Sequence, residues 1–192
     1  MFRKISLALL GIGLLGMLAG LSTLAVFTDS AAVDSNSFTT GTVDISTSPT
    51  TALVTFSNMA PGDTVTNPLV ATNAGSLQLR YAITSTATNT DAKGLKDQLV
   101  LTIKTIDLTA PGVPCDNFDG TQLYTGDVDG TTGALVGSNA QGSQAGDRTL
   151  AAAASETLCF RVDLPLATGN AFQNATTTAT LTFDAEQTAN NP

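Results

Sequence analysis

Side chains that could carry out acid–base or metal chemistry are few in this sequence. The 192 residues include no histidine, which excludes Ser-His-Asp and Cys-His nucleophilic sites and the HExxH zinc motif. Four carboxylates, those of Asp116, Asp119, Asp127 and Asp129, lie in one stretch rich in Gly and Asp. Paired carboxylates can hydrolyse glycosides, but acidic residues in such a stretch are more often solvated turn residues. We therefore predict no catalytic residue and no bound cofactor.

Calcium is the metal that these carboxylates would suit. The run Asp127-Val128-Asp129-Gly130 resembles the opening of a calcium-binding loop, in which oxygen ligands alternate and a glycine makes the turn. The full 12-residue pattern with its terminal Glu is absent, so hydrophilic turns are the alternative. The run Asn174-Ala175-Thr176 matches an N-glycosylation sequon. Whether the loop binds calcium and whether Asn174 is glycosylated both stay open.

The two cysteines, Cys115 and Cys159, are the only ones in the chain. In an exported protein an even cysteine count favours a disulfide. Two free, buried thiols are the alternative. A zinc site is not expected, because two distant cysteines without a histidine cannot supply four ligands.

The first 25 residues have the pattern of a secretory signal. Arg3 and Lys4 precede an apolar run from Ile5 to Leu21, and Thr23 and Ala25 are the small residues that a signal peptidase requires before the cleavage site. We predict cleavage between Ala25 and Val26, so that a signal peptidase is one partner. A retained membrane anchor is the alternative, because the apolar run is long enough to span a bilayer.

Cleavage would leave one acidic domain of ordinary size. Loss of Arg3 and Lys4 lowers the basic residues from 8 to 6 against 16 acidic ones. Phosphate binding needs clustered Lys or Arg, so we expect neither nucleic acid nor an anionic membrane as a partner. The remaining chain has no long apolar run, and we expect no stable membrane insertion after cleavage and an extracellular location.

Apolar and polar residues alternate with period two through most of the mature chain, which predicts β-strands. The predicted strands lie at 42–46, 53–56, 64–66, 68–72, 77–83, 99–103, 158–164 and 178–185, with one helical turn within 90–98. From Pro111 to Asp147 the chain is rich in Gly, Asp, Ser and Asn, which predicts a long surface loop with a possible short strand at Leu123 and Tyr124. This pattern favours an all-β, two-sheet sandwich.

Several segments resemble the secreted biofilm-matrix proteins typified by TasA and camelysin. They occur in the order of that family and span nearly the whole mature chain: Phe38–Ile45, Met59–Val65, Thr72–Leu77, Ala153–Leu158 and Phe183–Thr188. The resemblance implies a jelly-roll-like sandwich, a dedicated signal peptidase and assembly into extracellular fibres. It also implies a rival activity, because camelysin-type proteins are classed as metallo-endopeptidases. The cysteine pair and the Gly/Asp-rich loop are not part of the resemblance.

We therefore expect a secreted structural protein that polymerises with itself head to tail, with other matrix proteins as further candidate partners. The predicted parts are a signal peptide (1–25), an N-terminal segment (26–38), a β-sandwich (39–188) and a C-terminal tail (189–192). The mature terminus is the candidate donor strand, because Val26 begins it and Phe27, Ala31 and Val33 share one face. Asp29 falls on that same face, which counts against the proposal. Pairing of this segment within its own sheet, or fraying, is the alternative.

Overall fold

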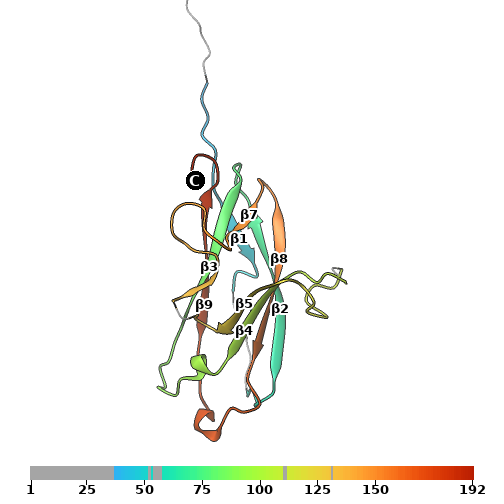
Figure 1. Cartoon of the computed structure of the whole chain (residues 1–192), viewed down its shortest axis with the longest axis vertical. Helices are drawn as coiled ribbons and strands as arrows, with labels where there is room; N and C mark the ends of the chain where they lie inside the picture. The colour runs from blue at the N-terminus through green and yellow to red at the C-terminus, as the bar shows by residue number, and fades with distance from the viewer. Residues whose placement is uncertain (1–36, 52, 54–57, 110–111, 131) are drawn as a thin grey trace, which may run out of the picture. The chain divides into compact units, whose positions relative to one another are not determined.

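The computed structural model describes residues 37–51, 53, 58–109, 112–130 and 132–192. Contacts divide the chain into two units, residues 1–39 and 40–192, and the β-structure belongs to the second. The described residues form nine strands and two 3₁₀ turns (Figure 1). The strands are β1 (Ile45–Ser48), β2 (Thr64–Asn73), β3 (Leu79–Ala87), β4 (Val100–Thr105), β5 (Gln122–Asp127), β6 (Ala134–Val136), β7 (Arg148–Leu150), β8 (Ser155–Asp163) and β9 (Ala179–Gln187).

Two antiparallel sheets form a sandwich, which confirms the predicted fold class. The first sheet has the order β1-β2-β8-β4-β5. In the second sheet β3 is central: β9 pairs with β3 along the whole of its length, while β6 and β7 pair with shorter parts of β3. Because β9 occupies one side of β3 completely, β6 and β7 lie on the other side. The jelly-roll description stays a prediction.

Pro68 determines where the pairing of β1 ends. The N–H of Leu164 donates to the carbonyl of Asp63 (3.0 Å), which shows that odd-numbered residues of β2 form the hydrogen-bonded pairs with β8. The backbone groups of even-numbered residues, including the nitrogen of Pro68, therefore face β1 on the other side of β2. Proline has no N–H to donate, and β1 accordingly ends at Ser48, which pairs with Val70 two residues beyond the proline.

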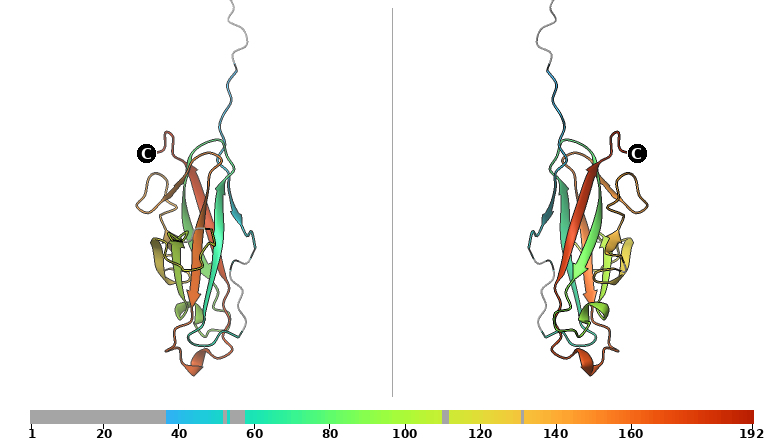
Figure 2. Two further views of the ribbon diagram at one scale, coloured as in Figure 1. Left: turned by 90° about the vertical axis from the view of Figure 1, so that its right-hand side faces the viewer. Right: turned by 90° about the vertical axis from the view of Figure 1, so that its left-hand side faces the viewer.

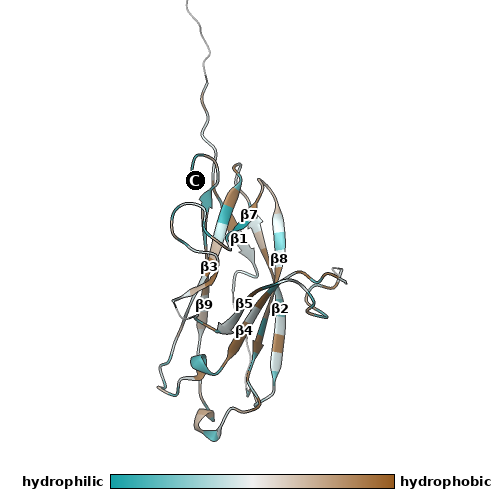
Figure 3. Ribbon diagram, in the orientation of Figure 1, coloured by the Kyte–Doolittle hydropathy of each residue, from teal (hydrophilic) through white to brown (hydrophobic). Residues whose placement is uncertain are grey.

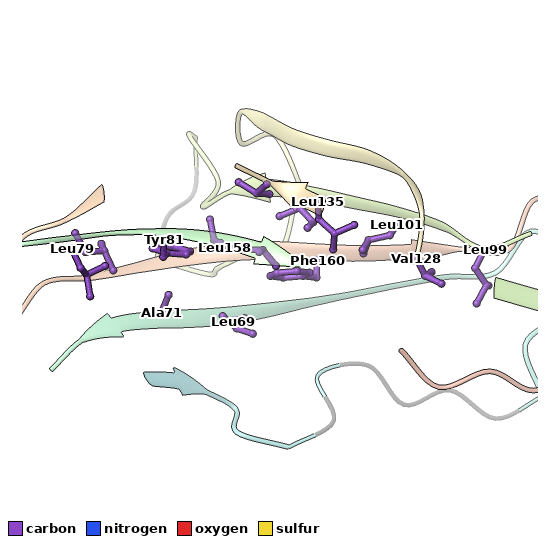
Figure 4. Packing of buried hydrophobic residues seen from close by; sticks show 14 of the residues in the cluster. Leu69, Ala71, Leu79, Tyr81, Leu99, Leu101, Val128, Leu135, Leu158 and Phe160 are labelled. Atoms are coloured by element: carbon purple, nitrogen blue, oxygen red, sulfur yellow. The ribbon is translucent and has the colours of Figure 1, made fainter. Parts of the chain in front are cut away.

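The core lies between the two sheets and follows the predicted alternation. On β8, Leu158 and Phe160 are buried, and on β3, Leu79, Tyr81 and Ile83 are buried. Figure 3 shows apolar stretches of β2 and β8 separated by paler and hydrophilic ones. Figure 4 shows the buried side chains of β2, β3 and β8 meeting between the strands.

The predicted surface loop from Pro111 to Asp147 is not one loop. It contains β5, which pairs with β4, and β6, which pairs with β3, so the chain crosses here from the first sheet to the second. Val128, Leu135 and Val136 are buried at this crossing. These three apolar residues, in an otherwise polar stretch, therefore cover the core on the side where β5 and β6 lie. The predicted helical turn is confirmed as a 3₁₀ turn at Leu95–Asp97.

Candidate functional site

The predictions made for the N-terminal part of the chain lie outside the described residues. These are the cleavage site at Ala25 and Val26, the donor-strand residues Phe27, Ala31 and Val33, and most of the predicted strand 53–56. Phe38 is among the first residues that the structure describes, and it is 96% exposed. The sandwich unit begins at Thr40, and Thr42 then accepts backbone hydrogen bonds from Ser76 and Leu77 (both 3.1 Å).

The cysteine pair forms the predicted disulfide, which joins Cys115 to Cys159. Cys159 alternates with the inward-facing Leu158 and Phe160 of β8, so its side chain lies on the outer face of the first sheet. The bond therefore fastens the connection between β4 and β5, residues 106–121, onto that outer face. In Figure 1 this connection passes β8 and extends beyond it. We call residues 106–121 the stapled loop.

Phe118, a residue of the stapled loop, packs beside the disulfide. Phe118 is only 5% exposed, and two cations lie over its ring: Arg161 Cζ is 3.8 Å and Lys104 Nζ is 4.6 Å from the ring centroid. Lys104 Nζ also donates to the Phe118 carbonyl (2.9 Å). Cation–π attraction and the disulfide thus hold the same stretch of backbone, although Cys115 and Phe118 both have positive φ angles (69° and 54°).

Asp119 holds together the base of the stapled loop. Its carboxylate accepts from the backbone N–H of Leu108 (2.7 Å) and from the hydroxyl of Thr109. The hydrogen bond from Thr109 is the main reason that the pKa of Asp119 lies below its usual value. Beyond this base, Leu108 and Val113 are 66% and 60% exposed. Asp107 is buried, and its Oδ2 accepts from the backbone N–H of Asn117 (3.2 Å).

The four carboxylates that suggested calcium do not converge. Asp116 and Asp119 belong to the stapled loop before β5, whereas Asp127 ends β5 opposite Val100 and Asp129 lies in the turn beyond it. A six-residue strand, roughly 20 Å long, separates the two pairs. Asp129 instead forms an ion pair with Lys96 (3.0 Å). The hydrogen bond to Asp97, and after it the one to Asp129, raises the pKa of Lys96. Within the described ranges, no three His, Cys, Asp or Glu side chains come together as a metal site.

A polar network that the sequence analysis missed links the two sheets. The hydroxyl of the buried Tyr81, on β3, donates to Glu156 on β8 (2.6 Å), and Arg148 on β7 forms an ion pair with Glu156. Burial first, and then the bond to Glu156, raises the pKa of Tyr81, while Glu156 raises the pKa of Arg148. Glu156 lies in one of the family-like segments, but Tyr81 and Arg148 follow no motif. No sequence signal places them together, because sheet pairing alone brings their strands into register.

Asn73 forms a second buried polar network that only the structure identifies. It is fully buried, and its side-chain amide donates to the carbonyls of Leu77 (2.8 Å), Ala151 (3.0 Å) and Leu150 (3.2 Å). Its Oδ1 accepts from the N–H of Gly75 (2.9 Å). One side chain thereby joins the turn between β2 and β3 to the connection between β7 and β8.

One shallow cleft opens on the outer face of the second sheet. It is bordered by Arg80, Asp147, Asp184 and Glu186, and its volume is about 160 Å³. Small-molecule sites usually enclose about 300–1,000 Å³, so this cleft is small for such a ligand. Arg80 and Glu186 form an ion pair with each other in this cleft (2.6 Å), and the hydrogen bond from Arg80 lowers the pKa of Glu186. In the part of the chain that the structure covers, no helix has the length and apolar character needed to cross a bilayer.

Comparison with known proteins gives one match over nearly the full length. A family model described as camelysin metallo-endopeptidase matches residues 1–191. No curated protein matches the chain. Among solved structures, the ASH/PapD-like domain 7 of human CEP192 is similar at 14% identity, over 87% of this chain and 99% of that domain, with a TM-score of 0.29. A TM-score this low carries no argument about fold or function.

Proposed function

The chain belongs to the camelysin metallo-endopeptidase family, and from that premise we propose that it is a secreted or cell-surface structural protein that polymerises into extracellular matrix fibres. The mature N-terminal segment, residues 26–38, is the part of the chain that joins one subunit to the next. It adds as a donor strand to the sandwich of a neighbouring copy. A head-to-tail contact of this kind does not close on itself, so it extends into a filament.

One feature of the sandwich supports the proposal above all others: one side of it ends in two strand edges that pair with no other described strand. The crossing from β5 to β6 closes the opposite side with buried Val128, Leu135 and Val136. On the open side β1 ends the first sheet, and β9 lies on the side of β3 away from β6. Exposed strand edges accept further strands. Phe38, at the end of the proposed donor segment, is almost fully exposed and available to a neighbour.

A peptidase is the second candidate, and the family description is the observation that favours it. The described residues do not fit a bound zinc ion: the sequence contains no histidine, both cysteines are in the disulfide, and no three carboxylates converge. We derive no catalytic step from them. Casein cleavage by pure mature protein, with and without a chelator, tests this candidate. Chelator-sensitive cleavage would establish it.

Assembly of the mature protein tests the structural role. We expect the chain beginning at Val26 to form fibres visible by electron microscopy, and a variant lacking residues 26–33 to remain a folded monomer. Phe27→Asp should weaken assembly without unfolding the domain, because a charge replaces the largest apolar side chain of the segment. Normal fibres from the deletion variant would refute the donor-strand mechanism and leave a matrix role intact.

A further inference from the structure

We propose that the outer edge of β9 is the acceptor, where residues 26–35 of a second copy add as a further strand of the second sheet. This inference rests on the proposed function and specifies the surface that it uses. Three features of β9 support this assignment: the direction of its backbone groups, the exposure of its inward side chains, and its length compared with the other edge.

Of the described strands, only β3 pairs with β9, so the backbone groups along the outer edge of β9 have no partner among the described residues. Thr88 N donates to Thr178 O (2.9 Å) and Thr188 N to Gln78 O (3.2 Å), at the two ends of the β3–β9 ladder. Hydrogen-bonded pairs alternate in an antiparallel ladder, so even-numbered residues of β9 bond to β3. The N–H and C=O groups of odd-numbered Leu181, Phe183 and Ala185 therefore point away from β3. Among the residues that the structure describes, none bonds to these groups.

The same three residues direct their side chains toward the core, where they are only half-buried. Their register partners on β3 include Ile83, opposite Phe183, and Tyr81, opposite Ala185, which are 0% and 1% exposed. The core is thus covered under β3 and open along β9, and Figure 2 (right) shows β9 in front of β3 at this edge. A strand added beside β9 would pair the free backbone groups and cover Leu181 and Phe183 together.

The other edge on this side is less suitable. β1 has only four residues, against nine in β9. Ala74 N donates to Asp44 O (2.8 Å), so Ile45 and Thr47 are the β1 residues whose backbone groups point outward. Beyond the end of β1, Leu53 of the same chain contacts β2, because Asn67 Nδ2 donates to the carbonyl of Leu53 (3.0 Å).

The occupant that fits β9 is the segment VFTDSAAVDS, residues 26–35. It contains no proline or glycine and is long enough to pair with all nine residues of β9. With Phe27, Ala31 and Val33 on one face, it can place apolar side chains beside Leu181 and Phe183. Because the segment lies at the free end of the mature chain, it can leave its own subunit and reach the β9 edge of another copy.

Single proline substitutions test which edge accepts the strand. Ala185→Pro removes an N–H that points away from β3, so the β3–β9 ladder keeps its bonds and the edge loses a donor. Thr47→Pro makes the matched change on the outer edge of β1. In full mature protein we expect both variants to fold, as judged by circular dichroism and thermal melting. Ala185→Pro should lower the mass of sedimented fibres at least tenfold, and Thr47→Pro should assemble like the parent.

Leu181→Lys keeps the test decisive if Ala185→Pro does not fold. At a half-buried edge position the lysine can reach solvent in the monomer, but an added strand would bury it. We expect a folded monomer without fibres. In parent fibres, amide hydrogen exchange at Leu181 and Phe183 should be slower than in the variant lacking residues 26–33. Folded β9 variants that assemble normally, or loss of fibres with Thr47→Pro alone, would overturn the assignment of β9. Absence of fibres from the parent itself would instead contradict the proposed function.

Discussion

Arg161 and Phe118 form the closest cation–π contact of the described structure, with 3.8 Å between the guanidinium carbon and the ring centroid. The two residues are 43 positions apart, and Cys115–Cys159 links the same two segments of chain. An aromatic side chain on the outer face of a sheet is thereby buried as completely as many core residues. The stapled loop is consequently held at one place on the first sheet while Leu108 and Val113 extend into solvent.

Phe118→Ala should destabilise the protein by about 3 kcal/mol, because it removes a buried ring and both cation–π contacts. Phe118→Leu is the matched control, since leucine keeps most of the apolar volume but has no π face. We expect leucine to restore only part of the loss in urea unfolding. Equal stability of the two variants would show that the cations contribute nothing through the ring.

Reduction of the Cys115–Cys159 bond should lower stability while β-structure remains. The bond closes a loop with a sequence separation of 44, worth about 4 kcal/mol in the chain-entropy account. For a domain of this size that corresponds to a fall in melting temperature of about 10 °C. Thiol labelling of denatured, non-reduced protein checks the bond itself: two reactive thiols would rule it out.

Asn73→Asp should be more damaging than Asn73→Ala. Aspartate keeps the shape of the side chain but replaces the amide donor with a charge facing the carbonyls of Leu77, Leu150 and Ala151. Alanine leaves these carbonyls without a donor at a cost of about 2–3 kcal/mol and adds no buried charge. Equilibrium urea unfolding of both variants measures the difference. An aspartate variant as stable as the parent would contradict the burial of this network.

Tyr81 should resist ionisation at pH 10. Burial and its bond to Glu156 raise its pKa above the ordinary value of 10.0, so the folded state favours the neutral phenol. The stability that follows is fully present below pH 10 and is lost as pH rises beyond it. In a Tyr124→Phe variant Tyr81 is the only tyrosine. We expect tyrosinate absorbance to appear only above pH 10 and together with unfolding; ionisation of the folded protein at pH 10 would contradict this.

The secreted protein should begin at Val26. Thr23 and Ala25 provide the small residues before the cleavage site, and Leu24 lies between them. Intact-mass analysis of exported material should show the loss of residues 1–25. Recovery of the full-length chain from membranes would instead support a retained anchor.

Local pattern was sufficient to predict the fold class and much of the core. Period-two alternation identified the inward residues of β3, β8 and β9, because side chains on a strand alternate between the two faces whatever the strand pairs with. The cysteine count predicted the disulfide. Between Pro111 and Asp147 the same local reasoning was only partly right: the possible short strand at Leu123 and Tyr124 is confirmed as part of β5, but a composition rich in Gly and Asp concealed β6. Those strands form only because β4 and β3 offer them partners.

Tertiary structure alone decided which distant residues meet. Strand register placed Arg148 beside Tyr81, and the packing of one sheet on the other brought Glu156 to both of them. The β4–β5 pairing likewise separated Asp119 from Asp127, which the sequence had suggested as ligands of one calcium ion. Tertiary structure also decided that β9 lies at the edge of the described second sheet. The sequence of β9 cannot reveal this position, because an edge and an interior strand with one buried face share the same alternation. Sequence thus determines which face of each strand is apolar, and the pairing of strands over long separations determines which backbone groups remain free.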